Sequence, residues 1–63
     1  MKATITIKMD NAAFEDGASY ETARILRKLA DRIDGHPNFS DGHSQPLKDI
    51  NGNTVGNFDI YAD

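Results

Sequence analysis

The stretch SYETARILRKLADRID, from Ser19 to Asp34, decides the fold of this chain. At about 100° per residue its apolar side chains fall in one arc, roughly 160° wide, and its charged side chains fill the opposite side. The arc holds Ile25, Leu29, Thr22, Ile33, Leu26, Ala30 and Ala23. This pattern predicts an amphipathic helix that buries one face.

Residues at both ends of the stretch indicate where the helix begins and ends. Ser19 is a good N-cap, and Glu21 lies in the first turn, near the positive end of the helix. Gly35 follows the last periodic residue and favours a C-terminal stop. Near the centre of the arc, Leu29 should be deeply buried, so Leu29→Ala should cost ~2–5 kcal/mol. Arg24→Ala, on the opposite face, should change stability by less than about 0.5 kcal/mol.

Residues 2–9, KATITIKM, alternate between apolar and polar side chains, which predicts a half-buried strand. Its apolar face holds Ala3, Ile5, Ile7 and Met9, and its solvated face holds Lys2, Thr4, Thr6 and Lys8. In the connection that follows, Phe14 is the only large apolar residue. We interpret Phe14 as an anchor on the core, with a partner contact as the alternative.

Residues 47–50 and 53–61 read as a β-hairpin around Asn51-Gly52, the strongest short-range hairpin signal. Either a type I′ turn or a three-residue loop with Gly52 in the left-handed region fits; the second would pair Leu47 with Val55. A bulge at Gly56-Asn57 would let Val55 and Phe58 share a face. Pro46 favours an edge position for the strand that it opens.

The order strand, helix, strand, strand predicts one α+β domain over residues 1–63. Because the helix reverses the chain, placing the third strand between the other two makes every neighbour antiparallel. The fold class is therefore β-α-β-β, a three-stranded antiparallel sheet in the order 1-3-2 with one amphipathic helix on one face.

Residues 35–46 form a long loop that holds both histidines, His36 and His43. Together with Asp34 and Asp41 they could be read as metal ligands, but their spacing fits no known site. No nucleophile, base and orienting group can be assembled, and no glycine-rich phosphate loop follows a strand. We therefore expect no enzyme, no metal and no cofactor; the sequence assigns no role to the histidine loop.

Seven basic and ten acidic residues give a net charge of −3, and there is no cysteine. Four basic residues form a stripe on the helix: Arg24, Arg27, Lys28 and Arg32. The acidic residues concentrate in two segments, 10–21 and 49–63. No apolar run approaches the ~20 residues that span a bilayer, and no signal peptide is evident. We expect a cytoplasmic protein with no membrane partner, as a monomer or a weak homodimer.

The chain resembles small proteins encoded by phages and prophages of proteobacteria. The resemblance lies in three segments: MKATITIKMDNAAF, ETARILRKLADRI and DINGNTVGNFDI. This group includes the anti-CRISPR inhibitors. The resemblance implies an inhibitor in a bacterial host cell that binds a Cas effector complex stoichiometrically and occludes its DNA-binding surface, sometimes by mimicking the charge of DNA. It assigns no individual residue.

Two functional hypotheses follow. In the first, carboxylates on a rigid surface compete with phosphates for basic side chains of the effector subunit. The partner-binding residues would be Asp10, Glu15, Asp16, Glu21, Asp49 and Asp59. In the second, the chain is a small nucleic-acid-binding regulator that uses the basic helix stripe.

Overall fold

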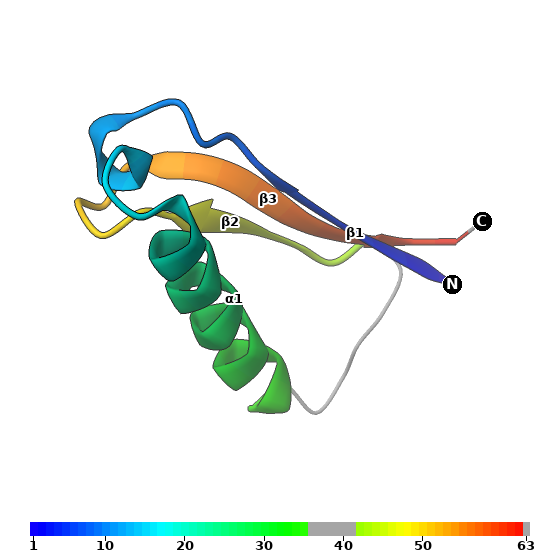
Figure 1. Ribbon diagram of the computed structural model, residues 1–63. Helices are drawn as coiled ribbons and strands as arrows, with labels where there is room; N and C mark the ends of the chain where they lie inside the picture. The colour runs from blue at the N-terminus through cyan, green and yellow to red at the C-terminus, as the bar shows by residue number, and fades with distance from the viewer. Residues whose placement is uncertain (36–41, 63) are drawn as a thin grey trace.

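The computed structural model describes residues 1–35 and 42–62 and has the predicted order of elements (Figure 1). Its elements are β1 (Lys2–Ile7), the 3₁₀ helix η1 (Ala12–Phe14), α1 (Ala18–Asp34), β2 (Ser44–Lys48) and β3 (Thr54–Tyr61). The sheet is antiparallel in the order β1-β3-β2. The predicted α+β class and strand order are confirmed.

The core lies between α1 and the sheet. Residues directly opposite one another in the ladder share a face, so Ile5, Phe58 and Gln45 point to the helix side. The buried apolar cluster consists of Phe14, Ile25, Leu29, Leu47, Val55, Phe58 and Ile60. Phe14 is therefore an anchor, as its first interpretation held, and Leu29 is buried as predicted.

The helix covers only part of the apolar face of the sheet. It packs against β2 and η1, and Figure 1 shows it on the β2 side, away from β1. The prediction that the apolar side of residues 2–9 enters the core is therefore wrong for Ala3, which is exposed, for Ile5, which is 48% exposed, and for Met9, which is 50% exposed and lies beyond β1. On the same flank of α1, Leu26 is 40% exposed.

The helix begins two residues earlier than the predicted cap at Ser19 implies. Gly17 is the N-cap, with φ of 149°, and no side chain caps the helix. The Glu21 N–H donates to the Gly17 carbonyl, so Ser19 lies inside the first turn and is not the cap. At the other end Gly35 is the C-cap, as predicted.

The hairpin closes through a three-residue loop. The Asp49 N–H donates to the Asn53 carbonyl, and Gly52 lies in the left-handed region with φ of 85°. The second of the two predicted turns is therefore the observed one, but Leu47 pairs with Gly56 and not with Val55.

A bulge causes this difference in pairing. Lys48 pairs with Thr54 while Leu47 pairs with Gly56, so Val55 is the extra residue. The bulge thus lies one position before the predicted Gly56-Asn57, and it turns Val55 into the core. Pro46 lies on an edge strand, as predicted, but it does not open that strand, because β2 begins two residues earlier, at Ser44, inside the predicted loop of residues 35–46.

Candidate protein-binding surface

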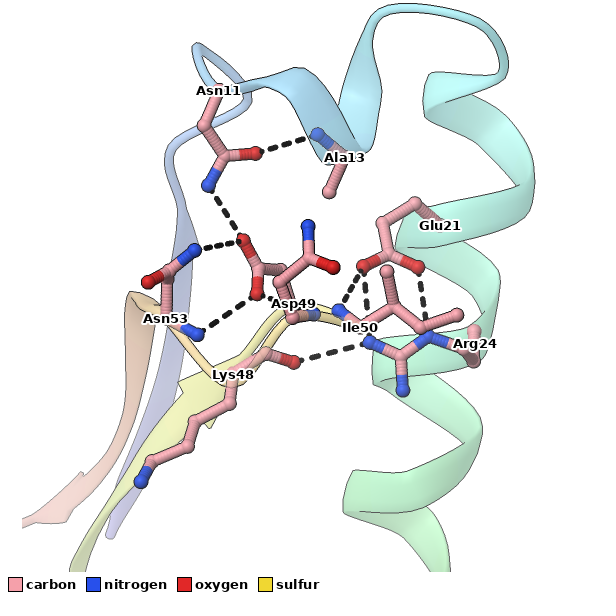
Figure 2. Close-up of polar contacts among 9 residues, drawn as sticks. Asn11, Ala13, Glu21, Arg24, Lys48, Asp49, Ile50 and Asn53 are labelled. Atoms are coloured by element: carbon pink, nitrogen blue, oxygen red, sulfur yellow. Dashed lines mark hydrogen bonds and ion pairs between the residues drawn. The ribbon is translucent and has the colours of Figure 1, made fainter.

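A polar network joins three segments at one end of the molecule: η1, the first turns of α1, and the β2–β3 loop (Figure 2). It begins at Asn11, which precedes η1. Its side-chain oxygen accepts the Ala13 N–H at 3.0 Å, and its side-chain nitrogen donates to Asp49 at 2.7 Å. Asn11 therefore caps the 3₁₀ helix and ties it to the hairpin loop.

Asp49 organises that loop from within. Its carboxylate accepts the backbone N–H groups of Asn51 and Asn53, both at 2.9 Å, and the Asn53 side chain at 3.3 Å. With the bond from Asn11, this buried carboxylate has four donors (Figure 2). An aspartate that binds the backbone two residues on is a strong turn former.

Glu21 holds the loop to the helix. Its carboxylate accepts the Ile50 N–H at 2.7 Å and binds Arg24 through two contacts, of 2.7 and 3.0 Å. Arg24 also donates to the Lys48 carbonyl at 3.2 Å. Among the described residues, no buried side-chain nitrogen or oxygen lacks a partner.

The contacts shift the pKa values of these groups in consistent directions. The hydrogen bond from Arg24 lowers the pKa of Glu21, and the Ile50 N–H adds to this, against the opposing effect of burial. The same bond raises the pKa of Arg24. Burial alone would raise the pKa of Asp49, but the bonds from Asn53, Asn11 and Asn51 outweigh it and lower that pKa. Both carboxylates are therefore stabilised in the charged form.

Above this network lies an open hollow of about 340 Å³, bordered by η1, the start of α1 and Ile50. Two large apolar side chains stand exposed on its border: Tyr20 is 83% exposed and Ile50 is 68% exposed. Asp16 also lines the hollow, and Glu15 next to it is exposed. We call Glu15, Asp16, Tyr20 and Ile50 the docking end.

The six carboxylates chosen from the sequence do not form one surface. Asp10, Glu15 and Asp16 are exposed. Glu21 and Asp49 are close together but buried, and their oxygens bind groups of this chain. Asp59 lies apart, on the uncovered face of the sheet, where it accepts hydrogen bonds from Ser44 and Asn57.

The basic stripe is also divided. Arg24 and Arg32 donate to the backbone carbonyls of Lys48 and Pro46 on the edge of β2. Arg27 and Lys28 are exposed.

Sequence reasoning did not select Tyr20 or Ile50. Tyr20 lies on the side of the helix opposite the apolar arc, and Ile50 adjoins the Asn-Gly turn. A large apolar residue at a position that does not face the core is a signal of a binding surface, and this signal was available in the sequence at both positions.

Of the four residues weighed as metal ligands, His36 and Asp41 lie outside the described residues. His43 lies 2.9 Å from the Gln45 side chain and packs edge-on against Phe58. Within residues 1–35 and 42–62, no three His, Cys, Asp or Glu side chains gather where they could hold a metal ion. No helix in these ranges has the length and hydrophobicity needed to cross a membrane.

No protein-family model matches this chain, and neither does any curated protein or solved structure.

Proposed function

We propose that this chain is a non-enzymatic inhibitor of the anti-CRISPR kind, which binds a protein subunit of a Cas effector complex in the bacterial cytoplasm and blocks target-DNA binding. The observation that carries the proposal is the docking end, where exposed Tyr20 and Ile50 line a hollow together with Asp16, and the exposed Glu15 precedes Asp16 in the chain. The resemblance of the sequence to small phage proteins supplies the class of target.

The chemistry of the docking end favours a basic protein surface. Carboxylates compete with phosphates for Lys and Arg side chains, and they speed the encounter with a positively charged groove. An exposed tyrosine supplies a large contact area at low entropy cost, and interface energy concentrates in such anchors. The acidic groups thus select a DNA-binding surface, and Tyr20 and Ile50 provide most of the affinity.

The buried network beneath supports this role. Glu21 and Asp49 hold the loop that carries Ile50, so the loop need not be ordered when the partner binds. A preorganised surface keeps more of its contact energy as affinity. Glu21 and Asp49 therefore act as positioning residues, although the sequence suggested direct contact.

The alternative, a nucleic-acid-binding regulator, has weaker support. Arg24 and Arg32 donate hydrogen bonds to backbone carbonyls of β2. Of the stripe, only Arg27 and Lys28 are therefore exposed without a described contact. A fluorescence anisotropy titration with DNA and RNA at two salt concentrations tests it. Phosphate binding must weaken steeply as salt rises.

The main test is a pull-down of purified Cas surveillance complexes by the tagged chain, followed by a target-DNA gel shift. Wild type should capture a complex and prevent its DNA shift. Tyr20→Ala and Ile50→Ser should each weaken capture by about tenfold or more, as loss of an interface anchor does. Charge reversal at Glu15 and Asp16 should slow association and remove its salt dependence.

Matched controls lie elsewhere on the surface. Tyr61→Ala removes a partly exposed tyrosine from the far end of the sheet, and Asp31→Lys reverses an exposed charge on α1. Both should bind like wild type. Failure to capture any Cas complex, or equal losses in the docking-end and control variants, would overturn the proposal.

A further inference from the structure

The two edges of the sheet are protected very differently. On β2, Pro46 has no N–H to offer, and the outward carbonyls of Pro46 and Lys48 accept hydrogen bonds from Arg32 and Arg24. Proline and charged side chains on an edge strand prevent another strand from pairing with it. The β2 edge is therefore closed.

The β1 edge has no such protection. Lys8 donates its N–H to the Val55 carbonyl at 2.7 Å, which continues the β1–β3 ladder. Antiparallel pairing alternates, so the odd-numbered residues Ala3, Ile5 and Ile7 turn their N–H and C=O groups outward. No hydrogen bond from residues 1–35 or 42–62 reaches these groups, and in Figure 1 no described segment lies along this edge.

An apolar strip adjoins the open edge on the helix side. It contains Ile5 from β1 and Met9 just beyond it, which are 48% and 50% exposed. The Thr22 hydroxyl lies 3.8 Å from the Met9 sulfur, so Met9 lies against the helix. An exposed hydrophobic strand edge of this kind is a template for another strand.

We propose that the β1 edge pairs with the β1 edge of a second copy of this chain, antiparallel across a two-fold axis, to form a six-stranded sheet. An isologous contact needs a self-complementary patch, and an antiparallel pair of identical strands provides one. With the axis perpendicular to the sheet, both helices lie on one face, and the two apolar strips meet at the centre. This proposal is independent of the proposed function, because the docking end takes no part in it.

Charge selects the register of the pair. Centring the axis on Ile5 would place Lys2 opposite Lys8 of the second copy, and like charges directly opposite are destabilising. Centring it on Thr6 places Lys2 opposite Asp10 of the second copy. The same register pairs Ile5 of one copy with Ile7 of the other, and Ala3 of one copy with Met9 of the other. Apolar side chains therefore meet along the helix side of the sheet.

The small core gives this pairing a physical reason. A chain of 63 residues buries a modest share of its surface, and domains of this size commonly gain stability from a second subunit. Among the described residues, seven apolar side chains are buried in the core. Edge pairing would bring the exposed Ile5 and Met9 against apolar side chains of the second copy and so reduce their exposure.

Single cysteines test the register directly, because the chain has no native cysteine. Thr6 would face Thr6 of the second copy as a non-hydrogen-bonded pair, with Cα atoms about 4.5 Å apart, within reach of a disulfide. Under mild oxidation Thr6→Cys should form a disulfide-linked dimer. Thr4→Cys, on the same face of the same strand, should remain monomeric because it faces Lys8. No crosslink by either variant, or a crosslink by Thr4→Cys alone, would overturn the proposal.

Sedimentation equilibrium tests the association without added cysteines. Wild type should approach twice the monomer mass of 6.9 kDa as concentration rises. Ile5→Lys places a charge in the apolar strip and should raise the dimer dissociation constant about tenfold or more. Ile50→Lys, the same change at the docking end, should dimerise like wild type. A wild type that stays at the monomer mass at every concentration would refute the dimer, and the pull-down with Cas complexes would be unaffected by that result.

Discussion

Glu21 and Arg24, one turn apart on α1, bind each other through two contacts and together hold the β2–β3 hairpin. Glu21 accepts the Ile50 N–H, and Arg24 donates to the Lys48 carbonyl (Figure 2). The pair therefore links helix to sheet through the backbone, independently of the apolar core. The buried position of Glu21 makes its partner necessary, because a buried carboxylate without a counter-charge is costly.

Arg24→Ala should therefore destabilise the fold, contrary to the expectation from the helical pattern that this residue is neutral. The change removes the counter-charge of a buried carboxylate and one support of the hairpin. The melting temperature of Arg24→Ala should lie clearly below that of Arg27→Ala, which changes an exposed arginine on the same helix. Thermal melts of both variants by circular dichroism at pH 7 measure the difference. Equal melting temperatures would show that the Glu21–Arg24 pair contributes no stability.

Acid should weaken the protein through the same network. The folded pKa values of Glu21 and Asp49 lie below their ordinary values. Stability from a lowered pKa is complete above the ordinary value and is lost as pH falls through the folded one. Because ordinary carboxyl values lie near 4, the melting temperature should begin to fall as pH drops through about 5 and keep falling toward pH 2.

Asp49→Asn isolates this effect. It should be less stable than wild type at pH 7, because it loses a charged acceptor of four hydrogen bonds. The gap between the two melting temperatures should narrow as pH falls, since wild-type Asp49 becomes neutral as well. Asp16→Asn, an exposed carboxylate, is the surface control. Parallel curves for wild type and Asp49→Asn would contradict the prediction.

The sequence could predict the fold because local patterns determine it. The helical period around Leu29, the alternation in residues 2–9 and the Asn51-Gly52 turn together leave one antiparallel arrangement. The pattern could not give the exact sector of the helix that is buried. Glu21 lies one turn before Ile25 and is drawn inward by Ile50 and Arg24, while Leu26 on the other flank stays exposed.

The candidate site was harder to predict for the same reason. From composition alone every carboxylate is expected to be an exposed charge. The Asp49 carboxylate instead accepts hydrogen bonds from the backbone of its own loop. The long-range contacts of Asp49 with Asn11 and of Glu21 with Ile50 cannot be read from the sequence, and they separate these two buried carboxylates from the exposed Glu15 and Asp16. The exposure of Tyr20, by contrast, could be read from the helical period, because Tyr20 lies opposite the apolar arc.

Gly56 should be the least replaceable glycine among the described residues. A Cβ built there would lie 1.8 Å from the Thr6 carbonyl oxygen, which is backbone and cannot move without separating β1 from β3. Gly56→Ala should therefore be largely unfolded, or should lose β1 from the sheet. Gly35→Ala is the matched control, because its added carbon would meet nothing closer than 3.7 Å at ordinary φ. Hydrogen exchange of the β1 amides would detect either outcome, and native-like protection in Gly56→Ala would contradict it.

Leu29 and Leu26 provide the last prediction, because the same substitution should destabilise the fold by very different amounts at the two positions. Leu29 is 3% exposed and belongs to the core, whereas Leu26 is 40% exposed. Leu29→Ala removes buried methyl groups and leaves a cavity, which should cost ~2–5 kcal/mol. A domain of this size has about 5 kcal/mol of stability, so this variant should be close to unfolding at 37 °C. Leu26→Ala should cost less than about 1 kcal/mol at concentrations where the chain is monomeric. Urea denaturation of both variants at low concentration measures the two values. Equal costs would mean that Leu26 is buried as deeply as Leu29, and hence that α1 lies over the β1 side of the sheet as well.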